Sequence, residues 1–266
     1  LVQLGRYVYM FDTSIDMSLV FDMLVEICLP MTPIFQTRCQ YAVVSLNGFI
    51  YVLGGVFDDF NEIGDIERFD PSTEEWELVS SMVPMSLSEA VAMNGYIYAI
   101  GHVKGESNPI MMVQVYDSAS DMWSSVSAPK LFRPEITAVA FRGHLYLIGG
   151  DVFDSAPRSA EEYDPEKDVW IPMPDLPVAH LLPRAIVLKD VLIVYEENLV
   201  HRSCGGNIPP VYWDSENRTW HIIHESSPLR MIHMYRICTI TEPNIIKGIV
   251  KQNRLESKRW VKSPFA

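Results

Sequence analysis

Two short segments of the sequence combine aromatic rings with carboxylates. The segment Phe57-Asp58-Asp59-Phe60 places two aspartates between two phenylalanines, and Phe153-Asp154 repeats the first step of that pattern. At protein interfaces aromatic side chains supply much of the binding energy, and charges at the rim mainly set association rate and selectivity. The chemistry indicated is recognition of another protein, provided that the rings point outward. Rings that fold back onto the body of the protein are the open alternative.

Bond-making chemistry has no recognisable motif here. The sequence contains no GxSxG, HExxH or Walker motif, and no GxGxxG that opens a helix. Four scattered cysteines form no CxxC pair and have no histidine at metal-ligand spacing, which is typical of thiols in a reducing compartment. These cysteines are Cys28, Cys39, Cys204 and Cys238. We therefore expect no enzyme, no catalytic residue, no metal site and no cofactor.

The charge disfavours two classes of partner. A formal net charge of −13 argues against binding of nucleic acid or anionic membranes. The charge is uneven, because residues 38–84 hold nine acids and two arginines, whereas residues 247–262 hold six basic residues and one glutamate. The acidic region is either a solvated face or a surface that steers a basic partner. Polar and turn residues interrupt every apolar run, so no transmembrane helix is expected.

Tryptophans recur at nearly constant intervals. Trp76, Trp123, Trp170, Trp220 and Trp260 are spaced by 47, 47, 50 and 40 residues. Seven positions before each of the first four lies an aromatic residue followed by aspartate, at Phe69-Asp70, Tyr116-Asp117, Tyr163-Asp164 and Trp213-Asp214. Two less regular copies extend the series. The first has Phe21-Asp22 with Cys28 in the tryptophan position, and the last has Asn253 in the aromatic position seven residues before Trp260. The spacing indicates six copies of one structural unit.

A second landmark precedes the tryptophans. Residues 47–55, 94–102 and 142–150 share a turn dipeptide, an aromatic and β-branched run, and a closing glycine. In the 38–84 copy this pattern predicts strands at 42–46 and 49–53 joined by a tight Asn47-Gly48 turn. A third strand ending at Phe69, a turn at 70–73 and an outer strand at 76–79 complete the unit.

Each unit is thus expected to be a four-stranded antiparallel sheet that is apolar on both faces. Such a sheet is stable only when it is stacked against copies of itself, and a closed ring leaves no damaging edge. The sequence predicts an all-β, six-bladed β-propeller, a single domain over residues 1–266. The approximate blades are 1–36, 37–84, 85–129, 130–177, 178–228 and 229–266.

The Gly-Gly doublet, the aromatic-Asp step and the spaced tryptophan resemble the Kelch repeat over nearly the whole chain. Copies 38–84 and 130–177 match it best, and His102 replaces the second glycine in the copy between them. The fifth copy has Tyr195-Glu196 and the first has Met10-Phe11 where the doublet is expected, and the sixth shows no doublet. Six-bladed Kelch domains are typical of BTB-Kelch proteins, so the resemblance implies this subfamily.

Strand alternation separates the connections into two ends. Turns within each pair of strands are short and uniform, as at Asn47-Gly48, Asn94-Gly95, Arg142-Gly143 and Lys189-Asp190. Loops between the second and third strands vary in length, and with the links between blades they form the opposite end, where binding is expected. By position, the resemblance implies ligand-pocket roles for the link arginines Arg38, Arg133, Arg184 and Arg230; structural roles at blade junctions are equally open. The expected partner-binding residues are Phe57, Asp58, Asp59, Phe60, Arg133, Phe153, Asp154, His180, Arg184 and Arg230.

Three functions follow from these observations. The first, implied by the resemblance, is the substrate-recognition domain of a cytoplasmic adaptor in a cullin-RING ubiquitin ligase, which holds a protein or peptide. Because residue 1 is Leu, we interpret the sequence as a fragment whose upstream BTB/BACK-type region would dimerise and dock cullin-3. The second is a cytoskeletal scaffold that binds actin, and the third is a propeller enzyme. In all three, we expect the first four tryptophans on equivalent strands and their preceding aspartates in structural turns.

Overall fold

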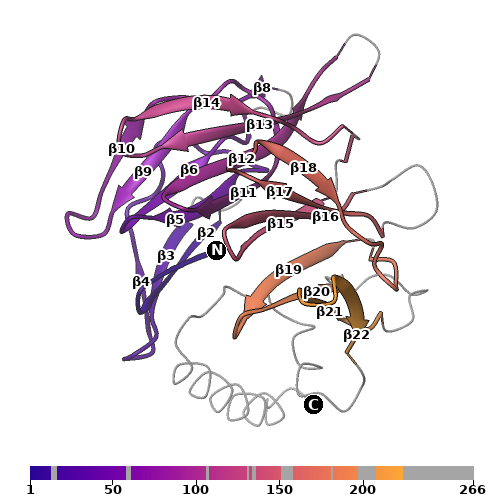
Figure 1. The fold of residues 1–266 in the computed structure, drawn as a ribbon. Helices are drawn as coiled ribbons and strands as arrows, with labels where there is room; N and C mark the ends of the chain where they lie inside the picture. Colours follow the sequence, from indigo (N-terminus) through magenta and orange to yellow (C-terminus); the bar gives the residue numbers. More distant parts are fainter. Residues whose placement is uncertain are drawn as a thin grey trace, which may run out of the picture.

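Five antiparallel sheets of four strands each form the blades of a β-propeller (Figure 1). The computed structural model describes residues 1–12, 17–57, 61–105, 108–130, 132–133, 136–150, 158–180, 182–196 and 208–223. The sixth predicted copy, at 229–266, lies outside these residues. The first strands of successive blades lie against one another, β1 with β5, β5 with β11, β11 with β15 and β15 with β19. These five strands are therefore innermost.

Each blade is built from consecutive strands. Blade 1 contains β1 (Val2–Leu4), β2 (Tyr7–Asp12), β3 (Met17–Asp22) and β4 (Ile27–Pro30); blade 2 contains β5 (Ala42–Leu46), β6 (Phe49–Leu53), β9 (Ile66–Asp70) and β10 (Glu75–Val79). Blade 3 contains β11 (Ser86–Met93), β12 (Tyr96–Val103), β13 (Ile110–Asp117) and β14 (Met122–Val126); blade 4 contains β15 (Ile136–Phe141), β16 (His144–Gly149), β17 (Ala160–Asp164) and β18 (Val169–Pro172). Blade 5 contains β19 (Pro183–Leu188), β20 (Val191–Glu196), β21 (Val211–Asp214) and β22 (Thr219–Ile222). A small hairpin, β7 (Val56–Phe57) with β8 (Asn61–Glu62), extends from blade 2.

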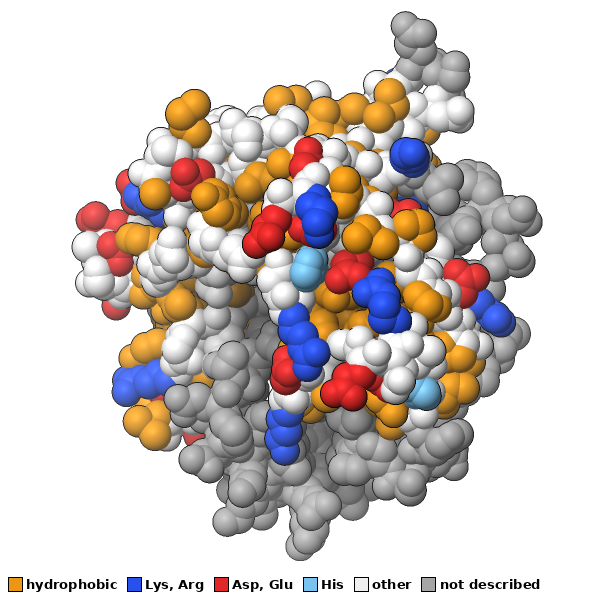
Figure 2. All heavy atoms as spheres, in the orientation of Figure 1, with side chains coloured by type: hydrophobic (Ala, Val, Ile, Leu, Met, Phe, Trp, Pro, Cys, Tyr) orange, Lys and Arg blue, Asp and Glu red, His pale blue; other side chains and the backbone are white. Residues whose placement is uncertain are grey.

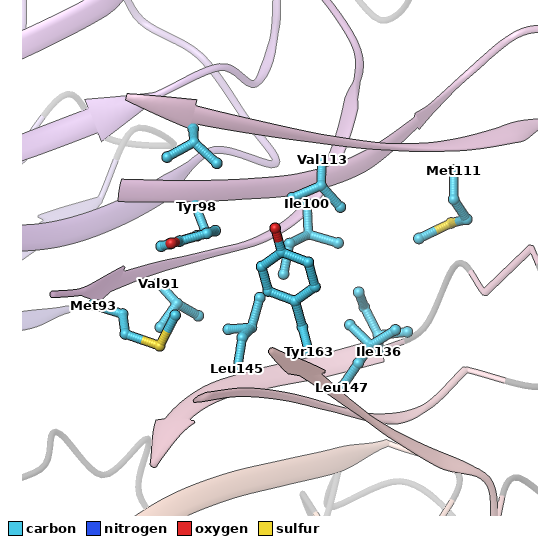
Figure 3. Close-up of a cluster of buried hydrophobic side chains, with 11 residues drawn as sticks. Val91, Met93, Tyr98, Ile100, Met111, Val113, Ile136, Leu145, Leu147 and Tyr163 are labelled. Atoms are coloured by element: carbon cyan, nitrogen blue, oxygen red, sulfur yellow. The ribbon is translucent and has the colours of Figure 1, made fainter. Parts of the chain in front are cut away.

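The hydrophobic core lies between blades. On β6, Ile50 and Val52 pack toward blade 1, and the alternate residues Tyr51 and Leu53 pack toward blade 3, because side chains of a strand alternate between its two faces. Figure 3 shows the same arrangement between blades 3 and 4, where Tyr163 lies among side chains from both. Apolar residues on both faces are thus required by the stacking.

Four tryptophans fasten neighbouring blades together. Each is paired across the outer hairpin with the aromatic residue that precedes the aspartate, as in Trp76 with Phe69 and Trp170 with Tyr163. Each indole Nε1 also donates a hydrogen bond to a backbone carbonyl of the preceding link: Trp76 to Thr32 (2.9 Å), Trp123 to Ser80 (2.8 Å), Trp170 to Ser127 (2.8 Å) and Trp220 to Pro174 (3.0 Å). The prediction of equivalent strands is confirmed for these four residues.

The expected strands of blade 2 are also confirmed, with two differences of alignment elsewhere. Strand register places Glu196, rather than Tyr195, at the position of the first glycine of the doublet, because Glu196 pairs with Pro183 as Gly149 pairs with Ile136. In the first copy Asp12, rather than Met10, takes this position, because Tyr7 pairs with Leu4 as Phe49 pairs with Leu46. The doublet was therefore assigned one residue too early in the fifth copy and two residues too early in the first. None of the described residues forms a helix long and apolar enough to cross a bilayer.

Candidate functional site

The two ends of the propeller differ as the loop lengths indicate. The tight turns between the first and second strands of blades 2–5 place both central residues at positive φ, as in Asn47 (51°) with Gly48 (86°) and Lys189 (50°) with Asp190 (60°). Such turns match the twist of the flanking strands. We call this the turn end. The loop end carries the links between blades and the connections between second and third strands.

Aspartates hold the second set of turns at the turn end. Asp70 Oδ1 accepts hydrogen bonds from the backbone N–H and the hydroxyl of Ser72, and Asp117 Oδ1 accepts one from the N–H of Ala119. These bonds favour the ionised form, so the pKa of each carboxyl lies below its usual value. Asp164 and Asp214 accept equivalent backbone bonds, and the predicted structural role is confirmed for all four.

Two ion pairs at the turn end join neighbouring blades. Arg142 in one tight turn pairs with Asp190 in the next at 2.6 Å, and Arg218 pairs with Glu162 at 3.1 Å. Both pairs join blades 4 and 5. Figure 2 shows acidic and basic side chains interspersed across the middle of the side of the molecule seen in Figure 1. The two ion pairs at the turn end are therefore contacts between blades of the scaffold.

At the loop end of blade 2, a buried arginine binds several parts of the chain. Arg38 Nη1 donates to the carbonyls of Gly54 (3.0 Å) and Asp65 (2.9 Å), Nε donates to that of Gln36 (3.3 Å), and Nη2 pairs with Glu67 Oε1 (2.5 Å). Both side chains of the ion pair are fully buried. Arg38 therefore joins the link to β6 and β9, which is the structural alternative considered for this residue.

The carboxylate of Glu67 fixes the link that carries Phe35. Glu67 accepts hydrogen bonds from the backbone N–H groups of Phe35 and Gln36. The ring of Phe35 itself is 61% exposed. An aromatic side chain is thus presented to solvent from a backbone that is held by a buried acid.

Phe57 is presented beside this link by the β7–β8 hairpin. Cys39 and Val56 exchange two backbone hydrogen bonds of 3.1 and 2.8 Å, which join the link to the hairpin. Gly55 permits this approach, because a Cβ at its φ of 98° would lie 2.7 Å from the carbonyl oxygen of Cys39. Phe57 is 41% exposed, so its ring is not folded onto the blades.

Exposed acids and one further apolar side chain lie on neighbouring segments of the loop end. Glu62 follows from β8, and Asp65 precedes β9; both are exposed. Val83, in the link to blade 3, is 55% exposed. We define Phe35, Phe57, Glu62, Asp65 and Val83 as the blade 2 platform. Its members come from two links and one hairpin, all at the loop end.

Two other predicted contact residues are buried within the protein. Arg133 pairs with Glu161 at 3.2 Å and is 3% exposed. His180 has no exposed side-chain surface, and its Nδ1 lies 3.6 Å from Glu196 Oε2. Their surroundings fit structural roles at the starts of blades 4 and 5, so we leave them out of the proposed contact surface.

Arg184 occupies a different setting near the axis. It lies on the innermost strand β19 and approaches Glu89 of β11 at 3.9 Å, with both side chains about one-third exposed. This ion pair connects blades 5 and 3. Arg184 accordingly stays a predicted contact residue. The other predictions, namely Asp58, Asp59, Phe60, Phe153, Asp154 and Arg230, lie outside the described residues.

Sequence reasoning missed Phe35 and Val83, although one signal was available. Both lie in blade-to-blade links. Phe35 lies three residues before Arg38, and Val83 lies two residues before Met85, which occupies the same position in the next link. Gln114, at the register of Glu67, bonds both the N–H and the carbonyl of Val83. In blades 2 and 3, the glutamate or glutamine two residues before the aromatic-Asp step holds a residue of the preceding link, whereas Glu161 at the same position of blade 4 makes no such described bond.

In the described part of the chain, no group of three or more His, Cys, Asp or Glu side chains could hold a metal ion.

Comparisons with known proteins agree with the repeat structure. The Kelch motif model matches residues 37–83 and 133–177. The chain is 28% identical over 172 residues to human Kelch-like protein 33, an alignment covering 64% of this chain and 22% of that protein. It is 37% identical over 78 residues to the Kelch repeat and BTB domain-containing protein 2 of Pongo abelii, covering 28% of this chain and 12% of that protein. The chain therefore spans less than a quarter of the length of these relatives.

Repeated sequence landmarks, stacked four-stranded sheets and these matches together identify this chain as a Kelch-repeat β-propeller similar to the Kelch domains of BTB-Kelch proteins.

Proposed function

We propose that this chain binds another protein through the blade 2 platform and performs no catalysis itself. The observation that carries the proposal is Phe35, whose ring is 61% exposed while its backbone N–H is bonded to the buried Glu67. A pre-positioned aromatic ring loses little conformational freedom on binding, which is why such side chains serve as interface anchors.

The surrounding charge specifies the chemistry of the partner. Glu62 and Asp65 are exposed beside the two rings, and the described link and hairpin residues around them contain one basic side chain, the buried Arg38. A segment with an apolar side chain flanked by lysine or arginine complements this surface. The acids would increase the association rate and reject acidic competitors.

The wider assembly is proposed from similarity. One relative is named for its Kelch repeats and its BTB domain. We propose that this chain is the substrate-recognition part of a comparable cytoplasmic adaptor, in which an upstream BTB region docks cullin-3 in a ubiquitin ligase. We also propose that six blades complete the ring, as the spacing of the repeats indicates.

A peptide-selection experiment tests the platform. A phage-displayed random peptide library is selected on the 1–266 protein, and the affinities of synthetic versions of the enriched peptides are measured by fluorescence polarisation. We expect enrichment of peptides with an aromatic or aliphatic residue next to Lys or Arg. Replacing Phe35 or Phe57 by Ala should weaken their binding by about 30-fold, the effect of losing an interface anchor worth about 2 kcal/mol.

Tyr96 provides the matched control at the turn end. Its side chain is 41% exposed, the same fraction as Phe57. Tyr96→Ala should leave peptide affinity within about twofold, the scatter expected of a surface change. Loss of binding in Tyr96→Ala together with unchanged binding in Phe35→Ala and Phe57→Ala would show that the partner uses the opposite end. Co-sedimentation of the wild-type protein with actin filaments would favour the cytoskeletal function.

A further inference from the structure

The turn between the third and fourth strands of blade 1 differs in chemistry from the same turn in the other blades. Two and three residues after the aspartate, blade 1 has Leu24 and Val25, which are 72% and 56% exposed. At these positions blades 2–5 have small, polar or charged residues: Ser72 and Thr73, Ala119 and Ser120, Glu166 and Lys167, and Glu216 and Asn217. Blade 1 therefore presents aliphatic side chains to solvent where the other described blades do not.

The outer strand β4 continues this apolar surface. Its residues Ile27 and Leu29 are 50% and 53% exposed. They point away from the preceding blade, because Cys28 between them has the register of Trp76, which packs toward the preceding blade, and side chains alternate along a strand. The counterparts in blades 2–5 are Glu75 and Glu77, Met122 and Ser124, Val169 and Ile171, and Thr219 and His221. Among the described blades, blade 1 alone is aliphatic at all four positions; we call Leu24, Val25, Ile27 and Leu29 the blade 1 patch.

Hydrogen bonds hold the backbone that carries the patch. Asp22 Oδ1 accepts from the N–H of Leu24 (2.9 Å), the carbonyl of Asp22 accepts from the N–H of Glu26 (2.8 Å), and Oδ2 pairs with Arg6 (2.9 Å). Asp70 binds the N–H of Ser72 in the same way. Because polar residues form the same turn in blade 2, folding of the turn does not account for Leu24 and Val25.

The backbone of β4 is poorly suited to pairing with an added strand. β4 is the outermost strand of its sheet (Figure 1). The N–H of Met31 donates inward to the carbonyl of Ser18, so by alternation the backbone groups of Pro30 and Cys28 point outward. Proline has no N–H to donate, and prolines on edge strands block such pairing. Contact through side chains is left, which is how an amphipathic helix binds an apolar surface.

The charge around the patch specifies what borders the apolar face of that helix. Residues 20–31 contain two acids and residues 69–79 contain four, and neither segment contains a lysine or arginine. The two segments adjoin, because the hydroxyl of Thr32 donates to the carbonyl of Glu74 and the indole of Trp76 donates to the carbonyl of Thr32. Lysine or arginine side chains complement this surface. A second copy of the chain would bring the same acids together.

We propose that the blade 1 patch binds an amphipathic helix of another protein, with aliphatic side chains on one face bordered by lysine or arginine. The patch lies at the turn end, whereas the blade 2 platform lies at the loop end. It is therefore a second binding site, and it does not depend on the proposed partner of the platform.

A subtractive selection tests this site with the platform removed. The target is the 1–266 protein with Phe35→Ala and Phe57→Ala, and the probe is a phage library that displays a stable helix with randomised surface positions. Phage that bind the same protein carrying Leu24→Ser and Val25→Thr are discarded. We expect enriched helices to carry Leu, Ile, Val or Met at spacings of three and four residues, next to Lys or Arg.

Substitutions taken from blade 2 measure the contribution of the patch. Leu24→Ser with Val25→Thr, and Ile27→Glu with Leu29→Glu, introduce residues that blade 2 carries at these positions, so both variants should melt within about 2 °C of the wild-type protein. Each should bind the selected helices at least about tenfold more weakly, the factor that corresponds to about 1.4 kcal/mol. Val169→Glu with Ile171→Glu makes the matched change in blade 4 and should leave affinity within about twofold.

The acids are tested through ionic strength. Glu26→Gln with Glu75→Gln should weaken binding about threefold at low salt, and the difference should disappear at about 1 M salt, where the Debye length is about 3 Å. Enrichment of nothing beyond the discarded phage, of helices without Lys or Arg, or of helices that bind the blade 4 variant as weakly as the blade 1 variants would overturn the proposal. Self-association or binding to phosphatidylcholine vesicles that Leu24→Ser with Val25→Thr abolishes would assign the patch to a second copy or to a membrane, and either result also overturns it.

Discussion

Blades 2 and 4 carry the same arginine–acid pair at the same register, but the two pairs are bonded differently. Glu67 lies opposite Val52 on the adjacent strand as Glu161 lies opposite Leu147, and each binds an arginine from the link before its own blade. Arg38 and Glu67 have no exposed side-chain surface. The side chain of Arg133 alone is 4% exposed and that of Glu161 13%.

The difference lies in the remaining hydrogen bonds. In blade 2, every guanidinium nitrogen of Arg38 has an acceptor, and the Glu67 carboxylate accepts two backbone N–H groups besides the arginine. In blade 4, Arg133 Nη1 and Glu161 Oε2 are buried and have no hydrogen-bond partner among the described residues. Burying an ion pair is favourable only if such bonds offset its lost hydration. The pair therefore stabilises the link of blade 2 more than that of blade 4.

This contrast explains why we place the platform on blade 2. A link whose arginine and glutamate have their polar atoms bonded holds the backbone of Phe35 in place. Among the described residues, the homologous link of blade 4 has no comparable set of bonds. An arginine–glutamate pair can thus hold a link firmly or less firmly, depending on how many backbone carbonyls and N–H groups it can bond.

Removing the arginines should give the largest difference in unfolding free energy between the two blades. Arg38→Met leaves the buried Glu67 without its partner, which should cost about 3–5 kcal/mol of unfolding free energy, the usual result of breaking a buried pair. Arg133→Met should cost less, about 1–2 kcal/mol, because the arginine makes one of its possible bonds. Urea unfolding monitored by tryptophan fluorescence measures both. Equal losses in the two variants would contradict the comparison.

Replacing the acids should give a smaller difference in unfolding free energy between the two blades. Glu67 accepts from three donors, and the amide group of Glu67→Gln would point a donor at one of them, for a loss of about 2 kcal/mol. Glu161→Gln should change stability by less than about 1 kcal/mol, because this carboxylate has one arginine bond in addition to an unbonded oxygen.

Blade 3 supplies a natural precedent for the glutamine. Gln114 occupies this register and uses its amide to bind both the N–H and the carbonyl of Val83 at 2.9 Å. A glutamine is therefore tolerated where the link turns one N–H and one carbonyl toward it, but blade 2 turns two N–H groups toward Glu67. A loss in Glu161→Gln as large as that in Glu67→Gln would mean that the two links have the same bonding in solution.

Much of the fold was predictable because its determinants are local. The Asn47-Gly48 turn, the strands on either side of it and the turn that begins at Asp70 depend on residues close in sequence, and the structure places them as predicted. Stacking followed from apolar residues on both faces of each sheet. The number of blades depends on residues 229–266, where the repeat has lost its landmarks, so that prediction stays open.

The site was less predictable because burial depends on contacts distant in sequence. Phe57 could be placed on a variable loop, and its exposure agrees. Arg133 and His180 also lie in links, but their acids, Glu161 and Glu196, come from later strands and from different strands in the two blades. No spacing rule gives that pairing. Phe35 was missed because its exposure depends on how Glu67, 32 residues later, holds its backbone.

The smallest expected effect concerns pH, where blades 2 and 4 should behave alike. Hydrogen bonds from Ser72 lower the pKa of Asp70, and the bond from the Lys167 ammonium is the main cause of the lowered pKa of Asp164. A carboxyl whose pKa is lower in the folded than in the unfolded protein contributes stability above its unfolded pKa of about 3.9 and loses it as pH falls through the folded value. Asp70→Asn and Asp164→Asn keep an oxygen that accepts the backbone bonds but do not titrate. Melting temperatures measured from pH 7 to pH 2 should therefore fall less below pH 4 in each variant than in the wild-type protein, by a similar small amount. A clearly larger change in Asp164→Asn would show that the two blades differ at the turn end as well, beyond the links where the structure places their difference.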